Sequence, residues 1–113
     1  HGKNVKVVAV EPTTSAVLSG ENPGPHKIQG IGAGFVPDNY HGEFVDEILK
    51  VSTEDAFSTA KTFGQEEGVL IGISSGANLY GALEVAKKLG KGKKVVTVAP
   101  DGGEKYISMG LFD

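Results

Sequence analysis

The sequence contains no cysteine, which excludes disulfides, thiolate metal ligands and a cysteine nucleophile. No apolar run approaches the roughly 20 residues that a membrane-spanning helix needs. Acidic and basic residues are mixed, with a net charge of −3 and no basic block, so the charge pattern does not favour a nucleic-acid partner. The opening His-Gly-Lys-Asn does not resemble a signal peptide. We therefore expect a cytoplasmic protein with neither a membrane nor a nucleic acid as partner.

Histidine is also scarce, and its positions limit the chemistry. His1, His26 and His41 are the only histidines, and their spacing is not that of metal ligands. No pair of acidic residues has a distinctive arrangement either. We therefore expect no metal site.

Glycine is abundant, at 17 of 113 residues, against an average of about 7%. The glycines gather at 20–42, 72–76 and 90–103, where they separate segments with regular patterns. Short apolar runs predict strands at 5–10, 45–51, 69–72 and 95–98. Alternation of such strands with helices predicts an α/β fold, a parallel sheet with flanking helices, in one domain.

Two helices are predicted between these strands. Ser52 and the acid at Asp55 resemble a capping box. Gly64 and Gly68 are candidate ends for that first helix. The second helix follows residue 74 and is closed by Gly90. The apolar residues at helical spacing are Ala56, Phe57, Ala60 and Phe63 in the first helix, and Leu79, Ala82, Leu83 and Ala86 in the second.

Gly72-Ile73-Ser74-Ser75-Gly76 places Ser74 between the strand at 69–72 and the second helix. The spacing matches the Gly-x-Ser-x-Gly elbow of serine hydrolases. That fold needs an acid and then a histidine after the serine; Asp101 supplies an acid, but every histidine precedes Ser74. The order disfavours a hydrolase. Two roles remain open: a helix N-cap, or a hydroxyl that hydrogen-bonds a bound cofactor.

The stretch 20–42 has no periodicity and is too long to be a simple connector. Its segment 30–34, Gly-Ile-Gly-Ala-Gly, lacks a preceding strand and the Gly-x-Gly-x-x-Gly spacing of a dinucleotide site. Small residues here allow a ligand to approach the backbone. The segment is either a surface loop or part of a ligand site.

Five segments are distinctive when taken together: Val8–Pro12, Val17–Gly20, Pro23–Phe35, Gly72–Ala77 and Pro100–Ser108. In this order they resemble the later part of the cysteine synthase family, also called the O-acetylserine sulfhydrylases. The resemblance covers nearly the whole chain, and the segment 23–35 is its most specific part. It implies that residues 1–113 form the C-terminal part of the large domain of a fold-type-II pyridoxal 5′-phosphate enzyme.

The family replaces the acetate of O-acetyl-L-serine by sulfide to give L-cysteine. The resemblance implies that Ser74 faces the pyridine nitrogen of the cofactor. A neutral hydroxyl need not protonate that nitrogen, so the cofactor becomes a milder electron sink. The implied wall of the substrate cleft is the run Gln29, Gly30, Ile31, Gly32 and Ala33.

The family's Schiff-base lysine, Ser/Thr-Gly-Asn substrate loop and Gly-Thr-Gly-Gly-Thr phosphate loop have no match among these residues. We expect them upstream, and we expect the chain alone to be inactive. The resemblance further implies a homodimer and a cleft that takes the C-terminal tail of serine acetyltransferase. Alternatives are a cystathionine β-synthase-like enzyme, an O-phosphoserine sulfhydrylase and a non-catalytic binding fragment.

Overall fold

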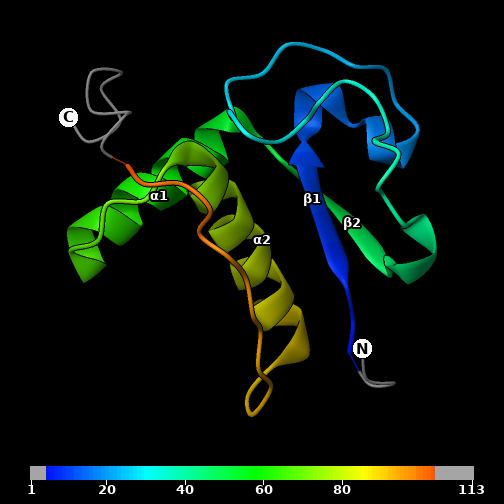
Figure 1. Ribbon diagram of the computed structural model, residues 1–113. Helices are drawn as coiled ribbons and strands as arrows, with labels where there is room; N and C mark the ends of the chain where they lie inside the picture. The colour runs from blue at the N-terminus through cyan, green and yellow to red at the C-terminus, as the bar shows by residue number, and fades with distance from the viewer. Residues whose placement is uncertain (1–4, 104–113) are drawn as a thin grey trace.

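The computed structural model describes residues 5–103 as a small α/β unit (Figure 1). Strands β1 (Val8–Pro12) and β2 (Glu47–Val51) pair in parallel, with Val8 opposite Glu47 and Pro12 opposite Val51. Helices α1 (Thr53–Glu67) and α2 (Ile73–Leu89) follow. Short 3-10 turns lie at Thr13–Ser15, Val17–Ser19 and Gly42–Phe44. The predicted α/β class and the parallel pairing are confirmed.

The two later strands of the prediction are not formed in the part of the chain that the structure describes. Within 69–72, only Ile71 makes a bridge, an isolated antiparallel one with Gly102. Residues 95–98 form no strand, and Val96 and Val98 are 90% and 65% exposed. A strand needs a neighbouring strand for its backbone hydrogen bonds, and an apolar run alone does not supply one. The prediction of strands at 69–72 and 95–98 was therefore wrong.

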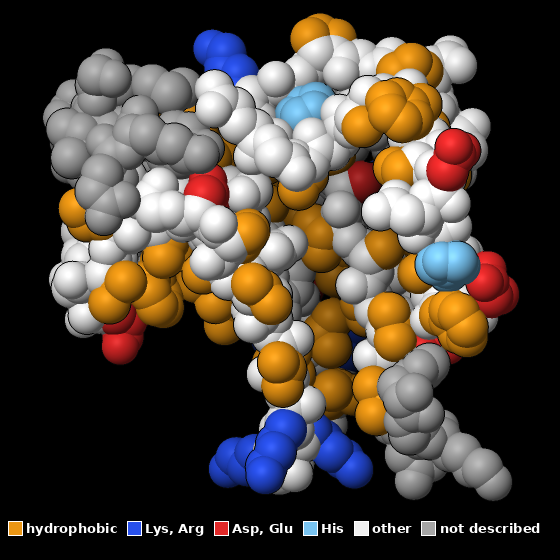
Figure 2. All heavy atoms as spheres, in the orientation of Figure 1, with side chains coloured by type: hydrophobic (Ala, Val, Ile, Leu, Met, Phe, Trp, Pro, Cys, Tyr) orange, Lys and Arg blue, Asp and Glu red, His pale blue; other side chains and the backbone are white. Residues whose placement is uncertain are grey.

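A groove of about 550 Å³ separates β1 from residues 93–97. Apolar side chains line much of it, including Val8, Val85 and Leu89. Figure 2 shows hydrophobic side chains down the middle of this face and lysines gathered at its lower tip. The valines of the predicted last strand therefore face this groove or the solvent rather than a partner strand.

Local signals placed helix α1 correctly. Ser52 is its N-cap, and the Ser52 hydroxyl accepts a hydrogen bond from the backbone N–H of Asp55 at 3.1 Å. Gly68 ends the helix in the left-handed conformation with φ +73°, which glycine adopts without steric cost. Gly64 lies inside the helix and does not end it.

Helix α2 packs closely against α1 through its first turns. A Cβ on Gly76 would lie 2.2 Å from the backbone oxygen of Ala56, so only glycine permits this approach. Further along, Gly81 is buried against Val10 of β1. The predicted apolar stripe of α2 is only partly covered, and Leu83 is 50% exposed. The core consists of Ile28, Val51, Ala56, Ala60, Ile71, Ile73 and Ala77.

Candidate functional site

Ser74 is the second residue of α2 and is almost fully buried, with 3% of its surface exposed. The N-cap position belongs to Gly72, which has no side chain to cap the helix. No hydrogen bond of the Ser74 hydroxyl to another residue of the described range 5–103 is found. The cap interpretation of Ser74 was therefore wrong, because that hydroxyl is not used to close the first turn.

Asp101 caps α2 from a distant part of the chain. Its Oδ1 accepts the backbone N–H of Ser75 at 3.1 Å and the Ser75 hydroxyl at 2.5 Å. The Ser75 hydroxyl in turn accepts the backbone N–H of Asp101 at 3.2 Å. A carboxylate at this end of a helix satisfies an orphan N–H and matches the positive end of the helix dipole. Ser75 is therefore tied to Asp101, whereas the Ser74 hydroxyl has no hydrogen-bond partner among residues 5–103.

Gly30 brings the glycine-rich loop onto Ser74. The backbone N–H of Ile31 bonds the carbonyl oxygen of Ile28 at 3.5 Å, which closes a turn with Gly30 at its third position. Gly30 has φ +100°, which a residue with a side chain rarely adopts. A Cβ there would lie 3.5 Å from Ser74 Oγ. Two predicted site elements, 44 positions apart in the sequence, therefore meet in space.

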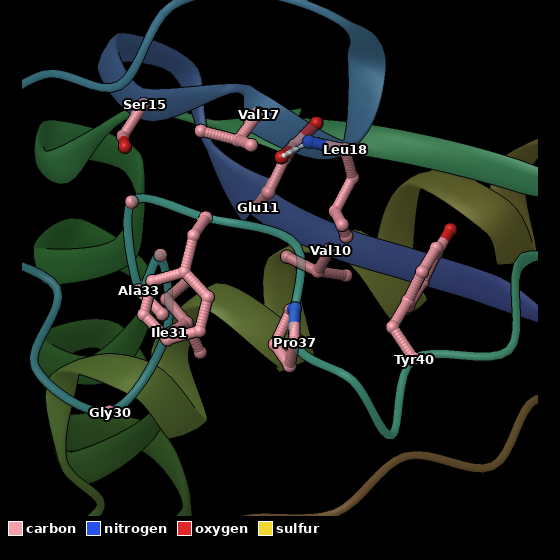
Figure 3. Close-up of a pocket in the computed structure, with 13 residues that line it drawn as sticks. Val10, Glu11, Ser15, Val17, Leu18, Gly30, Ile31, Ala33, Pro37 and Tyr40 are labelled. Atoms are coloured by element: carbon pink, nitrogen blue, oxygen red, sulfur yellow. Dashed lines mark hydrogen bonds between the residues drawn. The ribbon is translucent and has the colours of Figure 1, made fainter.

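The remaining residues of the predicted wall do not all face one way. Ile31, Gly32 and Ala33 line a cavity of about 470 Å³ at the carboxyl end of β1, and Gly30 also belongs to its lining. Figure 3 shows the side chains of Ile31 and Ala33 on the loop side of this cavity, opposite Val10 and Tyr40. Gln29 is exposed and is not part of the lining.

Glu11 is a residue of this region whose role the sequence did not reveal. It is 97% buried, and its carboxylate accepts the backbone N–H groups of Leu18 and Ser19 at 2.8 and 2.9 Å. The Ser19 hydroxyl adds a third bond at 2.6 Å. Charge-assisted bonds of this kind offset the cost of burying a carboxylate. Glu11 thereby fixes the 3-10 turns that form one side of the cavity.

A serine-hydrolase arrangement is not assembled in the described residues. Asp101 is bonded to Ser75, whereas the nucleophile of the motif would be Ser74. His26 uses both ring nitrogens within its own loop, on the backbone of Ile28 and Gly32. Neither the base nor the acid of a triad therefore contacts Ser74.

The comparisons with known proteins match this architecture. The family model for pyridoxal-phosphate dependent enzymes matches residues 1–101. The chain belongs to the pyridoxal-phosphate dependent enzyme family. A cysteine synthase of Staphylococcus aureus is 52% identical over 109 residues, which are 96% of this chain and 35% of that protein.

Solved structures of this family agree closely with the fold. A cysteine synthase from Entamoeba histolytica superposes with a TM-score of 0.94 at 47% identity, over 98% of this chain and 33% of its own. An O-acetylserine dependent cystathionine beta-synthase from Helicobacter pylori gives a TM-score of 0.89 at 37% identity, over 96% and 35%. The chain thus spans about a third of the length of these relatives, and its α/β unit is the one their family shares.

Two further observations limit the chemistry of residues 5–103. They contain no group of three histidine or acidic side chains placed to hold a metal ion. Nor does any helix in this range have the length and apolar character to cross a membrane. The family motif predicted at 100–108 is described only to Gly103, so residues 104–108 lie outside the described range.

Proposed function

We propose that the chain is the C-terminal part of the cofactor-binding domain of a cysteine synthase. The protein would replace the acetate of O-acetyl-L-serine by sulfide, with pyridoxal 5′-phosphate as cofactor. The observation that carries the proposal is Ser74, a residue only 3% exposed whose hydroxyl has no hydrogen-bond partner among residues 5–103 and lies beside the turn at Gly30. The 52% identity to a cysteine synthase supports the choice of reaction.

The residues present fit the ring end of the cofactor. Ser74 offers a neutral hydroxyl at the N-terminus of α2, and the Gly30 turn beside it carries no side chain. When bound, pyridoxal phosphate supplies the electron sink for loss of acetate. A hydroxyl that donates to the ring nitrogen leaves that nitrogen unprotonated, unlike a carboxylate partner. We propose that Ser74 makes this bond and so tunes the sink towards elimination.

The glycine-rich loop would form one wall of the substrate cleft. Gly30 has an exposed backbone in the left-handed conformation, so its peptide groups can approach a small substrate closely. Ile31, Gly32 and Ala33 continue the loop along the cavity beside β1. Gln29, which is exposed, would reach the substrate from the outer side of the turn.

A second candidate is a cystathionine β-synthase-like activity. The Helicobacter pylori enzyme that uses O-acetylserine for that purpose shares 37% identity with this chain. The higher identity to cysteine synthases, 47% and 52%, favours sulfide as the second substrate. A homodimeric, cytoplasmic enzyme that binds the tail of serine acetyltransferase belongs to the same proposal, as does a Schiff-base lysine outside this sequence.

The test uses the full-length protein that carries this sequence. The purified protein should show visible absorbance from bound pyridoxal phosphate and should form cysteine from O-acetylserine and sulfide. Ser74→Ala should lower the rate of acetate loss about fivefold or more, because a hydrogen bond contributes about 1 kcal/mol. The matched control is Ser58→Ala, which removes an exposed hydroxyl of α1.

The outcomes separate the candidate functions. Unchanged turnover in Ser74→Ala would remove Ser74 from the site. Cystathionine formation from homocysteine, without cysteine formation from sulfide, would select the second candidate. Labelling of Ser74 by a fluorophosphonate would instead point to a hydrolase.

A further inference from the structure

His26 connects the two ends of the turn that lies over Ser74. Its Nδ1 accepts the backbone N–H of Ile28 at 3.1 Å, and its Nε2 lies 3.0 Å from the carbonyl oxygen of Gly32. Between these two residues stands Gly30, beside Ser74 Oγ. We propose that His26 is a positioning residue that holds the Gly30 turn against Ser74 and so sets the shape of the substrate cleft.

The hydrogen bonds define the state of the imidazole. Because Nδ1 accepts a bond from an N–H, it carries no proton in this arrangement. Nε2 must then carry the proton and donate it to Gly32 O, since a carbonyl oxygen can only accept. A neutral ring in this one tautomer therefore pairs with the backbone N–H of Ile28, at the start of the turn, and with the carbonyl oxygen of Gly32, after its end.

The loop is packed so that this ring has a fixed place. Ile28 is fully buried in the core and anchors the start of the turn. Gly32, with φ +65°, lies so near the ring that a Cβ there would be 2.5 Å from His26 Nε2. The same Cβ would be 2.6 Å from Cγ of Pro12, at the end of β1. The turn is thus clamped between the imidazole, the core and the sheet.

This role rests on the proposed function, because the turn is a cleft wall only if the substrate binds beside Ser74. A residue that positions the wall contributes to substrate binding and does not take part in the transfer of a proton or a leaving group. Loss of such a residue raises KM and leaves kcat nearly unchanged. That split distinguishes positioning by His26 from a general loss of structure.

Two variants separate the two hydrogen bonds. His26→Asn keeps an oxygen that can accept the N–H two residues ahead, as in an Asx turn, but it cannot reach Gly32. His26→Gln places an amide N–H on a longer side chain, within reach of Gly32 O. The matched control is His41→Asn, at a histidine that is exposed and paired with Glu43.

We expect His26→Asn to raise KM for O-acetylserine about fivefold in the full-length enzyme, with kcat within about twofold of the parent, since one hydrogen bond is lost. His26→Gln should recover most of that loss, and His41→Asn should behave as the parent. Backbone hydrogen exchange of residues 28–32 should be faster in His26→Asn than in the parent. In His26→Gln the exchange rate should return towards that of the parent.

The proposal is overturned if His26→Asn has the parent's KM, if kcat falls while KM is unchanged, or if exchange at 28–32 does not change. The exchange measurement needs no catalysis. If the parent protein makes no cysteine, the proposed function fails, whereas the exchange rates still show whether His26 holds the turn.

Discussion

At the scale of single residues, the two adjacent serines of α2 differ in their hydrogen bonds. Ser75 is used by the fold, because its hydroxyl and backbone N–H both bond Asp101. The Ser74 hydroxyl has no hydrogen-bond partner among residues 5–103, which supports the proposed bond to the cofactor. The sequence could not predict this difference, since a serine at a helix start is a common N-cap and Asp101 lies 26 positions away. Only the folded chain shows which serine the acid meets.

Ser75→Ala is expected to lower the free energy of unfolding by about 1–3 kcal/mol, because Asp101 Oδ1 would lose a buried partner. Urea denaturation of the full-length protein would measure this loss. Ser58→Ala, in an exposed part of α1, should change the free energy by less than about 0.5 kcal/mol. Equal effects of the two substitutions would contradict a structural role for the Ser75–Asp101 pair.

Gly32 and Gly34 offer a matched comparison within the glycine-rich loop. Both have positive φ, so alanine adds similar backbone strain at either position. Only Gly32 lies against the His26 ring and Pro12; the nearest atom to a Cβ on Gly34 is 3.8 Å away. We expect Gly32→Ala to raise KM for O-acetylserine more than tenfold and Gly34→Ala less than threefold, as initial-rate kinetics would show. The reverse order would argue against the clamp around Gly32.

At the scale of elements, helices were easier to predict than strands. The signals for α1 are local: Ser52, the acids of the first turn and Gly68 lie within or beside the helix. A strand at 69–72 or 95–98 would depend on a neighbouring strand from elsewhere in the chain. The apolar composition of these segments could not show that residues 5–103 supply no such strand. The approach of Gly30 to Ser74 was likewise beyond any spacing argument: the family resemblance implied a role for each residue in the site, but only the fold shows that they are neighbours.

Glu47 of β2 forms ion pairs with two other parts of the chain. Its carboxylate pairs with Lys6, which precedes β1, at 2.8 Å, and with Lys88 of α2 at 3.1 Å. The hydrogen bond from Lys6, followed by that from Lys88, holds the pKa of Glu47 below its ordinary value. A carboxyl group whose pKa is lowered by folding stabilises the fold above its unfolded pKa, and that contribution is lost as the pH falls through the folded value.

We therefore expect the full-length protein to lose stability, in part through Glu47, as the pH falls below the ordinary pKa of a glutamate and through the lowered pKa of Glu47. Glu47→Gln should flatten this part of the profile, and high salt should have a similar effect because the pairs are near the surface. Thermal unfolding at a series of pH values would measure it, with the exposed Glu66→Gln as control. A profile unchanged by Glu47→Gln would show that these pairs do not couple to folding.

At the scale of the whole molecule, the described residues leave apolar surface uncovered. Val96 and Val98 are largely exposed, and the groove beside β1 is lined by valine and leucine side chains. The relatives that match are about three times as long. Exposed apolar surface of this kind marks an interaction region, and we propose that other parts of the full-length enzyme cover it.

The 113-residue chain by itself is expected to show no visible absorbance when mixed with pyridoxal phosphate and to form no cysteine, because it lacks the family's lysine motif. It should also bind a hydrophobic dye more strongly than the full-length protein does. Absorbance spectra and dye fluorescence of both proteins at equal concentration would test this. A coloured, active chain would show that the proposed division of the site is wrong.

The hydrogen bonds between Ser75 and Asp101 have a consequence for a protein whose chain has been cut. The turn after α2 is exposed and contains Lys91, Lys93 and Lys94, so a trypsin-like protease can reach it. A cut there would sever the covalent chain, yet residues 98–103 would still be tied to the helix start. Bonds from Asn78 to Val98, from Ser75 to Asp101 and from Gly103 to Leu70 would hold the two pieces together. A nicked protein would therefore run as two bands on a denaturing gel while it remained a single particle in solution.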